Sequence, residues 1–563
     1  MAKNNFVDYL NSLHNYNAQN ENVYGESNVN SPYYKNVNVE MGLSDYIKDK
    51  LITGEPQVII LTGHAGDGKT SILYQVAEKL NAQIDTQKKK NEINLPNGNK
   101  CMCIKDFSEL SDEVKVETMK EFYNILDDGN FVFMVANTGP LINTFGELAS
   151  EEEAEEAKIA LINAMDQNAG NIVNILGLKI SVINIATIDN TCFATAFLEK
   201  LLQDELWKPC EDCSKKDYCH ILKNRNLILE NKTKTFDFIN NHFVWLTEYG
   251  KRLTVRSMTE QLAFMITGGE NCDSVKNYGN DAYQLLYSNF FFGYQGINLE
   301  PLMLNITAVN IANQCRYDQK RLRSDEMLNV DKEYRKIFGE NVATIIENGA
   351  IMDSLQPGWP EFLRRAYFFT NIITENEVND MDYEDIFSKQ FKRFQNIRNG
   401  NDEPDKIDRN LIADALSMIY IGTPCSPDEI IPLTLSRESG LNQNVQLIIG
   451  KLYKREIRVI SEQTQEAKFN NGIERYKIYL KIDNQKIDTE LSLPMMNYFE
   501  ELKNGVIDTN IDPQLSHGVE SLKAEISKIV WDDEDSINMV ILKNDRNKEV
   551  HLEFTKDGKI REV

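Results

Sequence analysis

The segment Gly63–Thr70 (GHAGDGKT) constrains this chain more than any other feature, because it matches the pattern G-x-x-x-x-G-K-[ST] in full. The short apolar run Val58–Leu61 precedes it and is typical of a strand buried on both faces of a parallel sheet. Residues 70–80 follow with helical apolar spacing. A strand, a glycine-rich loop and a helix in this order predict a phosphate-binding P-loop, whereas a chance glycine turn would not need this context.

The chemistry of phosphate binding explains each residue type in the motif. The glycines let backbone N–H groups point at phosphate oxygens, and the following helix adds its positive N-terminal end. Lys69 is expected to contact the β- and γ-phosphates, and the Thr70 hydroxyl to occupy one position around Mg²⁺. ATP with Mg²⁺ is therefore the expected ligand. The residues expected to bind it are Gly63, His64, Ala65, Gly66, Asp67, Gly68, Lys69, Thr70 and Ser71.

A second strand candidate, residues 102–105, ends in an acidic segment. A P-loop ATPase needs a carboxylate at the end of a neighbouring strand to hold Mg²⁺ through water, and Asp106 is the candidate. Glu109, one helical turn later, is the candidate for polarising the attacking water. The alternative is that Asp106 or Ser108 caps a helix that begins near Leu110.

Two further polar residues occupy positions that resemble those of AAA+-like ATPases. The next strand candidate, residues 131–136, ends at Asn137, which resembles the asparagine that senses the γ-phosphate in that group. Arg256 precedes an apolar-faced helix and resembles the lid arginine that touches the same phosphate, with Arg252 as second choice. The alternatives are that Asn137 starts a turn and that the arginine lies at the surface of a helix start.

Cys210, Cys213 and Cys219 form a C-x₂-C-x₅-C pattern. Two thiolates separated by two residues make a chelating turn, so the pattern predicts a structural zinc site, with an iron–sulfur cluster as the alternative. Unliganded buried thiols are the simpler interpretation. His220 is adjacent to Cys219, which makes it a strained fourth ligand, so Cys192 and Cys272 are candidates for that position.

Length and composition indicate a folded protein of several domains. A chain of 563 residues is too long for one hydrophobic core, and its 42% hydrophobic and 26% charged residues are typical of globular proteins. The alternation of strand and helix candidates predicts an α/β P-loop NTPase core, a parallel sheet with flanking helices. The expected segments are an irregular N-terminal arm (1–42), a P-loop ATPase domain (43–195), a helical lid with the cysteine knuckle (196–290), a helical domain (291–440) and an α+β or β-rich C-terminal domain (441–563).

The charge balance and the apolar runs exclude some functions. The net charge of −25 argues against a protein that holds DNA by itself, so DNA is expected to be reached through partners. No uninterrupted apolar run is long enough for a membrane span, and the N-terminus lacks the basic-then-apolar order of a signal peptide. A cytoplasmic location without membrane contact is expected.

Four segments together resemble one family of bacterial defence proteins. They are GHAGDGKTSIL, KDFSE, VANTGPL and W-x₂-C-x₂-C-x₅-C, which lie within about residues 50–270. The set resembles DptF-type ATPases of DNA phosphorothioation-dependent restriction systems. This resemblance implies an ATPase subunit that acts with other restriction-complex subunits, including a helicase-like protein, against foreign DNA that lacks the host's phosphorothioate marks. The KDFSE segment departs from the AAA+ pattern because no glutamate follows Asp106 directly.

The expected function is therefore an ATP-binding and ATP-hydrolysing subunit of an antiviral DNA restriction complex. The alternative is a STAND-type scaffold or signalling protein, in which nucleotide controls assembly and hydrolysis is incidental. A homo-oligomer is compatible with both.

Overall fold

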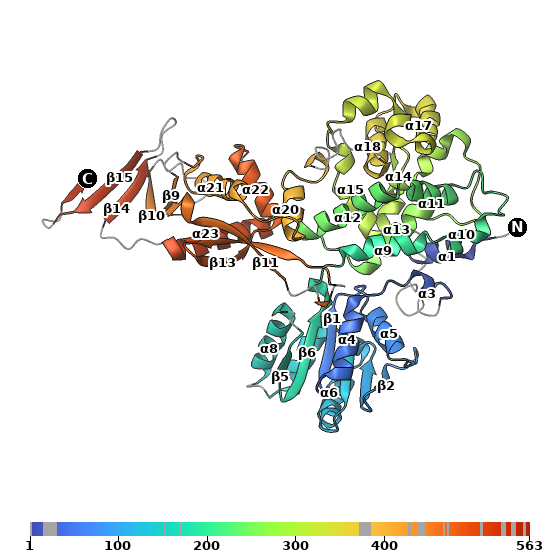
Figure 1. The fold of residues 1–563 in the computed structure, drawn as a ribbon, viewed down its shortest axis with the longest axis horizontal. Coiled ribbons are helices and arrows are strands. Elements are labelled where there is room, and N and C mark those ends of the chain that lie inside the picture. The colour runs from blue at the N-terminus through green and yellow to red at the C-terminus, as the bar shows by residue number, and fades with distance from the viewer. Residues whose placement is uncertain are drawn as a thin grey trace. The chain divides into compact units, whose positions relative to one another are not determined.

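The computed structural model describes residues 3–14, 31–150, 153–167, 170–370, 384–425, 429–435, 445–464, 468–469, 472–506, 511–530, 536–541, 548–555 and 559–562. The chain divides into two units, residues 1–382 with 465–473, and residues 383–464 with 474–563 (Figure 1). Both units mix helices and strands. The five segments expected from the sequence stay a prediction; the expected segment 291–440 contains residues of both units, and the expected boundary at residue 441 lies outside the described residues.

The first unit contains a six-stranded sheet with the strand order β2-β3-β4-β1-β6-β5. Its four inner strands are parallel, whereas β2 and β5 pair antiparallel with their neighbours. The expected parallel sheet is thus present in the four inner strands, and the two edges differ, because short turns join β2 to β3 and β5 to β6, and such turns link antiparallel strands. The strands are β1 (Val58–Gly63), β2 (Lys90–Asn94), β3 (Lys100–Ile104), β4 (Phe131–Asn137), β5 (Ile172–Ile175) and β6 (Leu178–Asn184).

Helices cover both faces of this sheet (Figure 1). Alternate residues of β1 belong to opposite cores, with Ile59 and Leu61 on one side and Val58 and Ile60 on the other. The continuous apolar run in the sequence thus follows from burial on both faces. The first core includes α4 (Gly42–Thr53) and α5 (Lys69–Lys79), and the second includes α6 (Asp112–Asp127), α7 (Thr138–Leu148) and α8 (Ala154–Gln167).

Part of the N-terminal arm is helical, although the sequence led us to expect an irregular segment. Helices α1 (Asn5–Ser12) and α3 (Tyr34–Val37) lie within residues 1–42. The Asn4 side chain accepts a hydrogen bond of 3.0 Å from the Phe6 N–H and so caps α1. Phe6, Val7 and Leu10 are buried, so α1 is held by one apolar face that the Asn- and Tyr-rich composition conceals.

The remainder of the first unit is mostly helical, as the sequence predicts beyond residue 196. One short hairpin interrupts it, formed by β7 (Tyr294–Gln295) and β8 (Asn298–Leu299). The helices are α9 (Thr191–Leu201), α10 (Asp204–Trp207), α11 (His220–Glu230), α12 (Lys232–Glu248), α13 (Val255–Thr267), α14 (Tyr287–Phe291), α15 (Thr307–Gln314), α16 (Tyr334–Phe338), α17 (Glu340–Asp353) and α18 (Trp359–Thr370).

The second unit combines two antiparallel sheets with helices, ordered β16-β15-β14-β10-β9 and β11-β12-β13. Asp483 and Asn484 both have positive φ, which is typical of a two-residue hairpin turn, here between β12 and β13. Its elements are α20 (Phe391–Arg398), α21 (Lys406–Ile421), β9 (Ile430–Thr434), β10 (Val445–Tyr453), β11 (Ile457–Gln463), β12 (Tyr476–Ile482), β13 (Gln485–Glu490), α22 (Leu493–Lys503), α23 (Pro513–Val530), β14 (Ser536–Ile541), β15 (Lys548–Phe554) and β16 (Ile560–Glu562).

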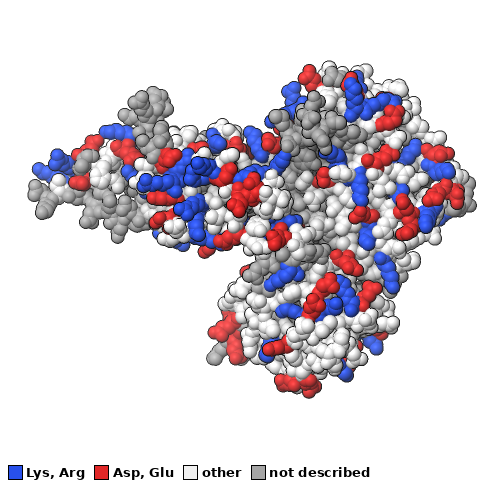
Figure 2. Space-filling model, in the orientation of Figure 1, with Lys and Arg blue, Asp and Glu red and all other residues white. Residues whose placement is uncertain are grey.

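On the face shown in Figure 2, charged side chains lie on both units. On that face, Lys and Arg are interspersed with Asp and Glu rather than gathered by sign. Across the described residues, no helix is both long enough and apolar enough to cross a bilayer.

Candidate nucleotide-binding site

The glycine-rich loop that joins β1 to α5 has the backbone shape that its glycines permit. Gly66 and Gly68 have φ values of +91° and +85°, a region that favours glycine. A Cβ atom on Gly66 would lie 3.1 Å from the Cβ of Arg256, so the loop also needs glycine for close approach to α13. Gly68 is the N-cap of α5, and its carbonyl accepts a 3.0 Å hydrogen bond from the Ile72 N–H. The N-terminal end of α5 therefore faces the loop directly.

Lys69 is buried in the loop and holds it in shape. Its Nζ donates hydrogen bonds to the carbonyl oxygens of Gly63 at 3.0 Å and His64 at 2.7 Å. Burial lowers the pKa of Lys69, whereas the nearby carboxylates of Asp67 and Asp106 act in the opposite direction. The ammonium group thus lies close to two acidic groups, one from the loop and one from the end of β3.

A cavity of about 260 Å³ opens beside the loop. It is formed by segments that are far apart in the sequence: the N-terminal arm, the loop itself, the ends of β3 and β4, and helices α9 and α13. Polar groups and aromatic rings both line it. The lining residues are Tyr9, Leu13, Tyr34, Val37, Asn38, Val39, Ala65, Gly66, Gly68, Lys69, Thr70, Ser71, Asp106, Val135, Asn137, Phe193, Phe197, Val255, Arg256 and Thr259.

Asp106 lines this cavity and also caps the 3₁₀ turn Phe107–Glu109, whereas the helix expected near Leu110 begins at Asp112 with Ser111 as its N-cap. The Asp106 Oδ1 accepts a 3.0 Å hydrogen bond from the Ser108 N–H at the start of this turn. Burial raises the pKa of Asp106, as does the nearby Glu109, while Lys69 lowers it. Glu109 itself is not among the residues that line the cavity; its side chain is 61% exposed and pairs with Lys89 at 3.1 Å.

Asn137 lies at the end of β4, between the loop and Asp106. Strand β4 separates β1 from β3, and Asn137 is in register with Gly63. Its N–H donates a 2.7 Å hydrogen bond to the Ser108 hydroxyl, which ties it to the segment that carries Asp106. Asn137 is the N-cap residue of α7, yet its side chain makes no capping hydrogen bond. The amide is therefore not used as a cap, which favours a role in the cavity.

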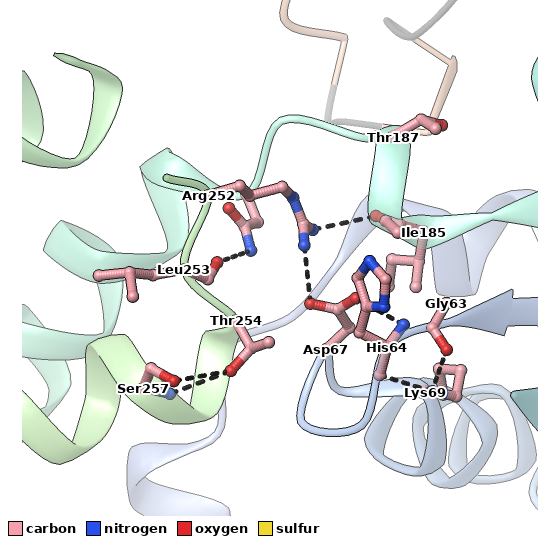
Figure 3. A network of polar contacts seen from close by, with 12 residues as sticks. Gly63, His64, Asp67, Lys69, Ile185, Thr187, Arg252, Leu253, Thr254 and Ser257 are labelled. Atoms are coloured by element: carbon pink, nitrogen blue, oxygen red, sulfur yellow. Dashed lines mark hydrogen bonds and ion pairs between the residues drawn. The ribbon is translucent and has the colours of Figure 1, made fainter. Parts of the chain in front are cut away.

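The two candidate arginines before α13 have different surroundings. Arg256 lines the cavity and its N–H donates a 3.0 Å hydrogen bond to the Gly66 carbonyl. Arg252 instead donates hydrogen bonds to Asp67 Oδ1 at 3.0 Å and to the Ile185 carbonyl at 3.1 Å (Figure 3). Arg256 thus lines the cavity, whereas the Arg252 side chain is bonded to the glycine-rich loop through Asp67.

Asp67 also bonds within its own loop, where its Oδ2 accepts a 3.0 Å hydrogen bond from the His64 N–H. Thr254, between the arginines, caps α13 by accepting a 3.2 Å hydrogen bond from the Ser257 N–H (Figure 3). The loop and the start of α13 are therefore one connected polar network.

Several lining residues escaped the sequence analysis. Tyr9, Leu13 and Tyr34 come from the N-terminal arm, and Phe193 and Phe197 lie one turn apart on α9 with their rings stacked, their centroids 5.8 Å apart. The helical spacing of Phe6, Val7 and Leu10 could have indicated α1. The spacing of the α9 pair is equally visible, but an apolar pair at this spacing usually indicates core.

The residues present fit a nucleoside triphosphate and Mg²⁺. Lys69, Arg256 and the N-terminal end of α5 supply positive charge for phosphates. The Thr70 hydroxyl and the Asp106 carboxylate are oxygen donors, which Mg²⁺ prefers. The aromatic and apolar groups of the arm and α9 suit the base and sugar.

The three cysteines of the C-x₂-C-x₅-C pattern lie apart from this cavity. They line a second, small cavity of about 20 Å³, together with Cys272. Within the described ranges, no three His, Cys, Asp or Glu side chains already form a metal-binding group. His220 does not line this second cavity; burial lowers the pKa of its ring, and Nε2 lies 3.4 Å from the Thr267 carbonyl.

Comparison with known proteins returned no match: no protein-family model, no curated protein and no solved structure matches this chain. A proposal about its function therefore rests on the sequence and structure of the chain itself.

Proposed function

We propose that this chain is a P-loop ATPase that binds ATP with Mg²⁺ in the cavity beside the glycine-rich loop. The observation that carries the proposal is the gathering of Lys69, Thr70, Asp106, Asn137 and Arg256 around one cavity. These residues come from four separate segments, and each type suits one part of a nucleoside triphosphate or its metal.

The proposed roles follow from position. Lys69 and Arg256 offset negative charge on the phosphates, and the Thr70 hydroxyl and Asp106 carboxylate hold and orient Mg²⁺ and its water. When bound, Mg²⁺ neutralises charge that develops on the phosphate oxygens. Asn137 donates or accepts a hydrogen bond at the phosphate end, since its amide is not used to cap α7. The aromatic groups of the arm and α9 exclude water from the base side.

For the wider role, we propose a subunit of a bacterial antiviral DNA restriction complex that works with partner subunits. The support is the resemblance of four segments to DptF-type ATPases and the net charge of −25, which makes a basic partner the natural DNA-binding element.

One observation favours the second candidate, a nucleotide-switched scaffold of the STAND type. Glu109 pairs with Lys89 and does not line the cavity, so no second carboxylate stands beside Asp106 among the described residues that line it. The loop is also joined to α13 by the Asp67–Arg252 ion pair, a link through which bound nucleotide can alter a helix. Such a protein would turn ATP over slowly.

The two candidates are separated by measuring hydrolysis and oligomer size on the same protein. Steady-state ATP hydrolysis stimulated by DNA and by co-purified partner subunits supports the restriction ATPase. Hydrolysis that is indifferent to DNA, with an oligomer size that depends on ATP or ADP, supports the switched scaffold. A protein that binds neither nucleotide contradicts both.

A further inference from the structure

Four cysteines from two distant parts of the chain line one small cavity. Cys210, Cys213 and Cys219 lie in the segment between α10 and α11, and Cys272 lies in the loop that follows α13. The cavity measures about 20 Å³. Cys210 is buried and the other three are partly buried. All four are free thiols.

The backbone around the first three cysteines is built as a chelating turn. The Cys213 N–H donates a 3.3 Å hydrogen bond to the Cys210 carbonyl, and the Lys216 N–H donates one of 3.1 Å to the Cys213 carbonyl. Cys219 is the N-cap residue of α11, and its carbonyl accepts a 3.0 Å hydrogen bond from the Lys223 N–H. Two turns and a helix start thus bring three thiols to one cavity.

Lys215 holds the Cys272 loop against this turn. Its Nζ donates hydrogen bonds to the carbonyl oxygens of Cys272 at 2.9 Å, Asp273 at 3.1 Å and Val275 at 3.0 Å. An ammonium with three backbone acceptors spans the two segments, so the approach of Cys272 is fixed by contacts that do not involve sulfur. This arrangement is a second observation, independent of the cysteine spacing.

The residue before α1 closes the cavity from a third side. The Asn4 amide donates hydrogen bonds to the Cys210 Sγ at 3.3 Å and to the Leu206 carbonyl at 3.0 Å. The Cys272 Sγ lies 3.8 Å from the Asn4 carbonyl. The sulfur atoms of Cys210 and Cys272, one from each segment, thus both contact Asn4.

The other candidates for a fourth ligand are elsewhere. Cys192 lines a different cavity, between the start of α4 and α9, and does not line the one with the three cysteines. His220 is directed to the Thr267 carbonyl and packs edge-on against Tyr278. Cys272 is therefore the residue that completes a set of four.

We propose that Cys210, Cys213, Cys219 and Cys272 bind one zinc ion in a closed, structural four-thiolate site. Four thiolates and one Zn²⁺ form the tetrahedral arrangement that structural zinc sites prefer. The four thiols do not stand at ligand geometry, so zinc binding rotates them inward, and each thiol releases its proton to the solvent as its Zn–S bond forms. The site carries a double negative charge, which Lys215 and Lys216 at its wall offset.

Zinc there would join the 208–219 turn to the 271–275 loop, and the start of α1 would be held to both through the contacts of Asn4 with Cys210 and Cys272. Helix α1 carries Tyr9, which lines the larger cavity. The metal would thus brace the arm that forms one wall of the candidate nucleotide site, while the glycine-rich loop itself stays independent of it.

The test uses the full chain purified without chelator. Elemental analysis is expected to find one zinc ion per chain. Cysteine alkylation followed by peptide mass spectrometry is expected to show these four thiols protected until a chelator is added. The chelator should leave the reactivity of Cys101, Cys103, Cys192, Cys315 and Cys425 unchanged. Alkylation of the folded wild-type protein needs no variant, so it remains decisive if a variant fails to fold.

Variants identify the fourth ligand. Cys272→Ser should weaken zinc retention against a competing chelator by more than about tenfold, whereas the matched control Cys192→Ser should retain zinc as the wild type does. Cobalt(II) in place of zinc should give the intense sulfur-to-metal charge-transfer absorption of four thiolates. Absence of metal, iron with sulfide, or protection of Cys192 in place of Cys272 would overturn the proposal.

Discussion

The Asp67 carboxylate accepts a 3.0 Å hydrogen bond from the guanidinium of Arg252, a residue 185 positions away (Figure 3). The Asp67 side chain is fully buried and that of Arg252 is 18% exposed. This ion pair joins the glycine-rich loop to the segment that starts α13. Because the same segment places Arg256 in the cavity, the loop and the lid arginine are positioned by one network.

Removing Arg252 should destabilise the protein by about 3 kcal/mol, because Arg252→Ala leaves the buried Asp67 carboxylate without its charged partner. The double variant Asp67→Asn/Arg252→Ala should lose less unfolding free energy than the two single variants added together, since in the double variant neither charge is left without its partner. Denaturant-induced unfolding measures both.

The matched control is Arg335→Ala. Arg335 is half-exposed and pairs with Glu340 and Glu347 at the surface, so its loss should change stability by no more than about 0.5 kcal/mol. Equal effects of Arg252→Ala and Arg335→Ala would contradict a structural role for the Asp67 ion pair.

Asp106→Asn should reduce Mg²⁺-dependent ATP hydrolysis by about 10- to 100-fold and leave nucleotide binding largely in place. The amide keeps the shape and the capping acceptor, but loses the charge that orients the metal and its water. Phosphate release measured at saturating ATP tests this. Glu109→Gln is the matched control, and it should hydrolyse ATP as the wild type does, because Glu109 pairs with Lys89 outside the cavity. If Glu109→Gln lost hydrolysis and Asp106→Asn did not, Glu109 rather than Asp106 would be the carboxylate that hydrolysis requires.

Asp106→Asn should raise the stability of the folded protein at neutral pH when no nucleotide is bound. Burial raises the pKa of Asp106, so the folded protein holds this proton more tightly than the unfolded chain does. The ionised carboxylate therefore destabilises the fold above its folded-state pKa, and this cost disappears as the pH falls towards the ordinary aspartate range near 4. Melting temperatures of wild type and Asp106→Asn should differ at pH 7 and converge near pH 4. A lower melting temperature for the variant at pH 7 would contradict this.

Arg256→Ala should weaken ATP binding more than ADP binding, because the proposed contact of its guanidinium is with the terminal phosphate. Arg256→Lys should restore part of the ATP affinity, since a lysine keeps the charge but not the planar fork. Calorimetric titration with both nucleotides makes the comparison. Equal losses for ATP and ADP would place Arg256 away from the terminal phosphate.

Local sequence patterns predicted the elements around the loop well. The strands at residues 58–61 and 131–136, and the helix from Lys69, appear within one or two residues of the expected bounds. They were predictable because an uninterrupted run of apolar residues indicates a strand buried on both faces, and apolar residues at helical spacing indicate a helix with one buried face. Asp106 and Asn137 were chosen for the same reason: Asn137 ends β4, and Asp106 follows the end of β3 after one residue.

Long-range pairings could not be read from the sequence. Nothing near Asp67 indicates a partner at Arg252, and nothing in the Asn-rich arm indicates that Tyr9 and Tyr34 line the cavity. The edge strand β5 was not predicted, because four residues carry little periodicity. Contacts of this kind depend on tertiary packing, which overrides local propensity.

The proposed function requires the loop Gly63–Thr70 to bind the phosphates of ATP, and the variant Lys69→Ala removes the charged side chain of that loop. Calorimetric titration of MgATP into wild type and Lys69→Ala is the measurement, with circular dichroism to show that both are folded. The wild type should bind one MgATP per chain. The variant should lose binding by at least about tenfold, because Lys69 supplies the point charge at the phosphates. A folded Lys69→Ala protein that binds MgATP with wild-type affinity would contradict the account.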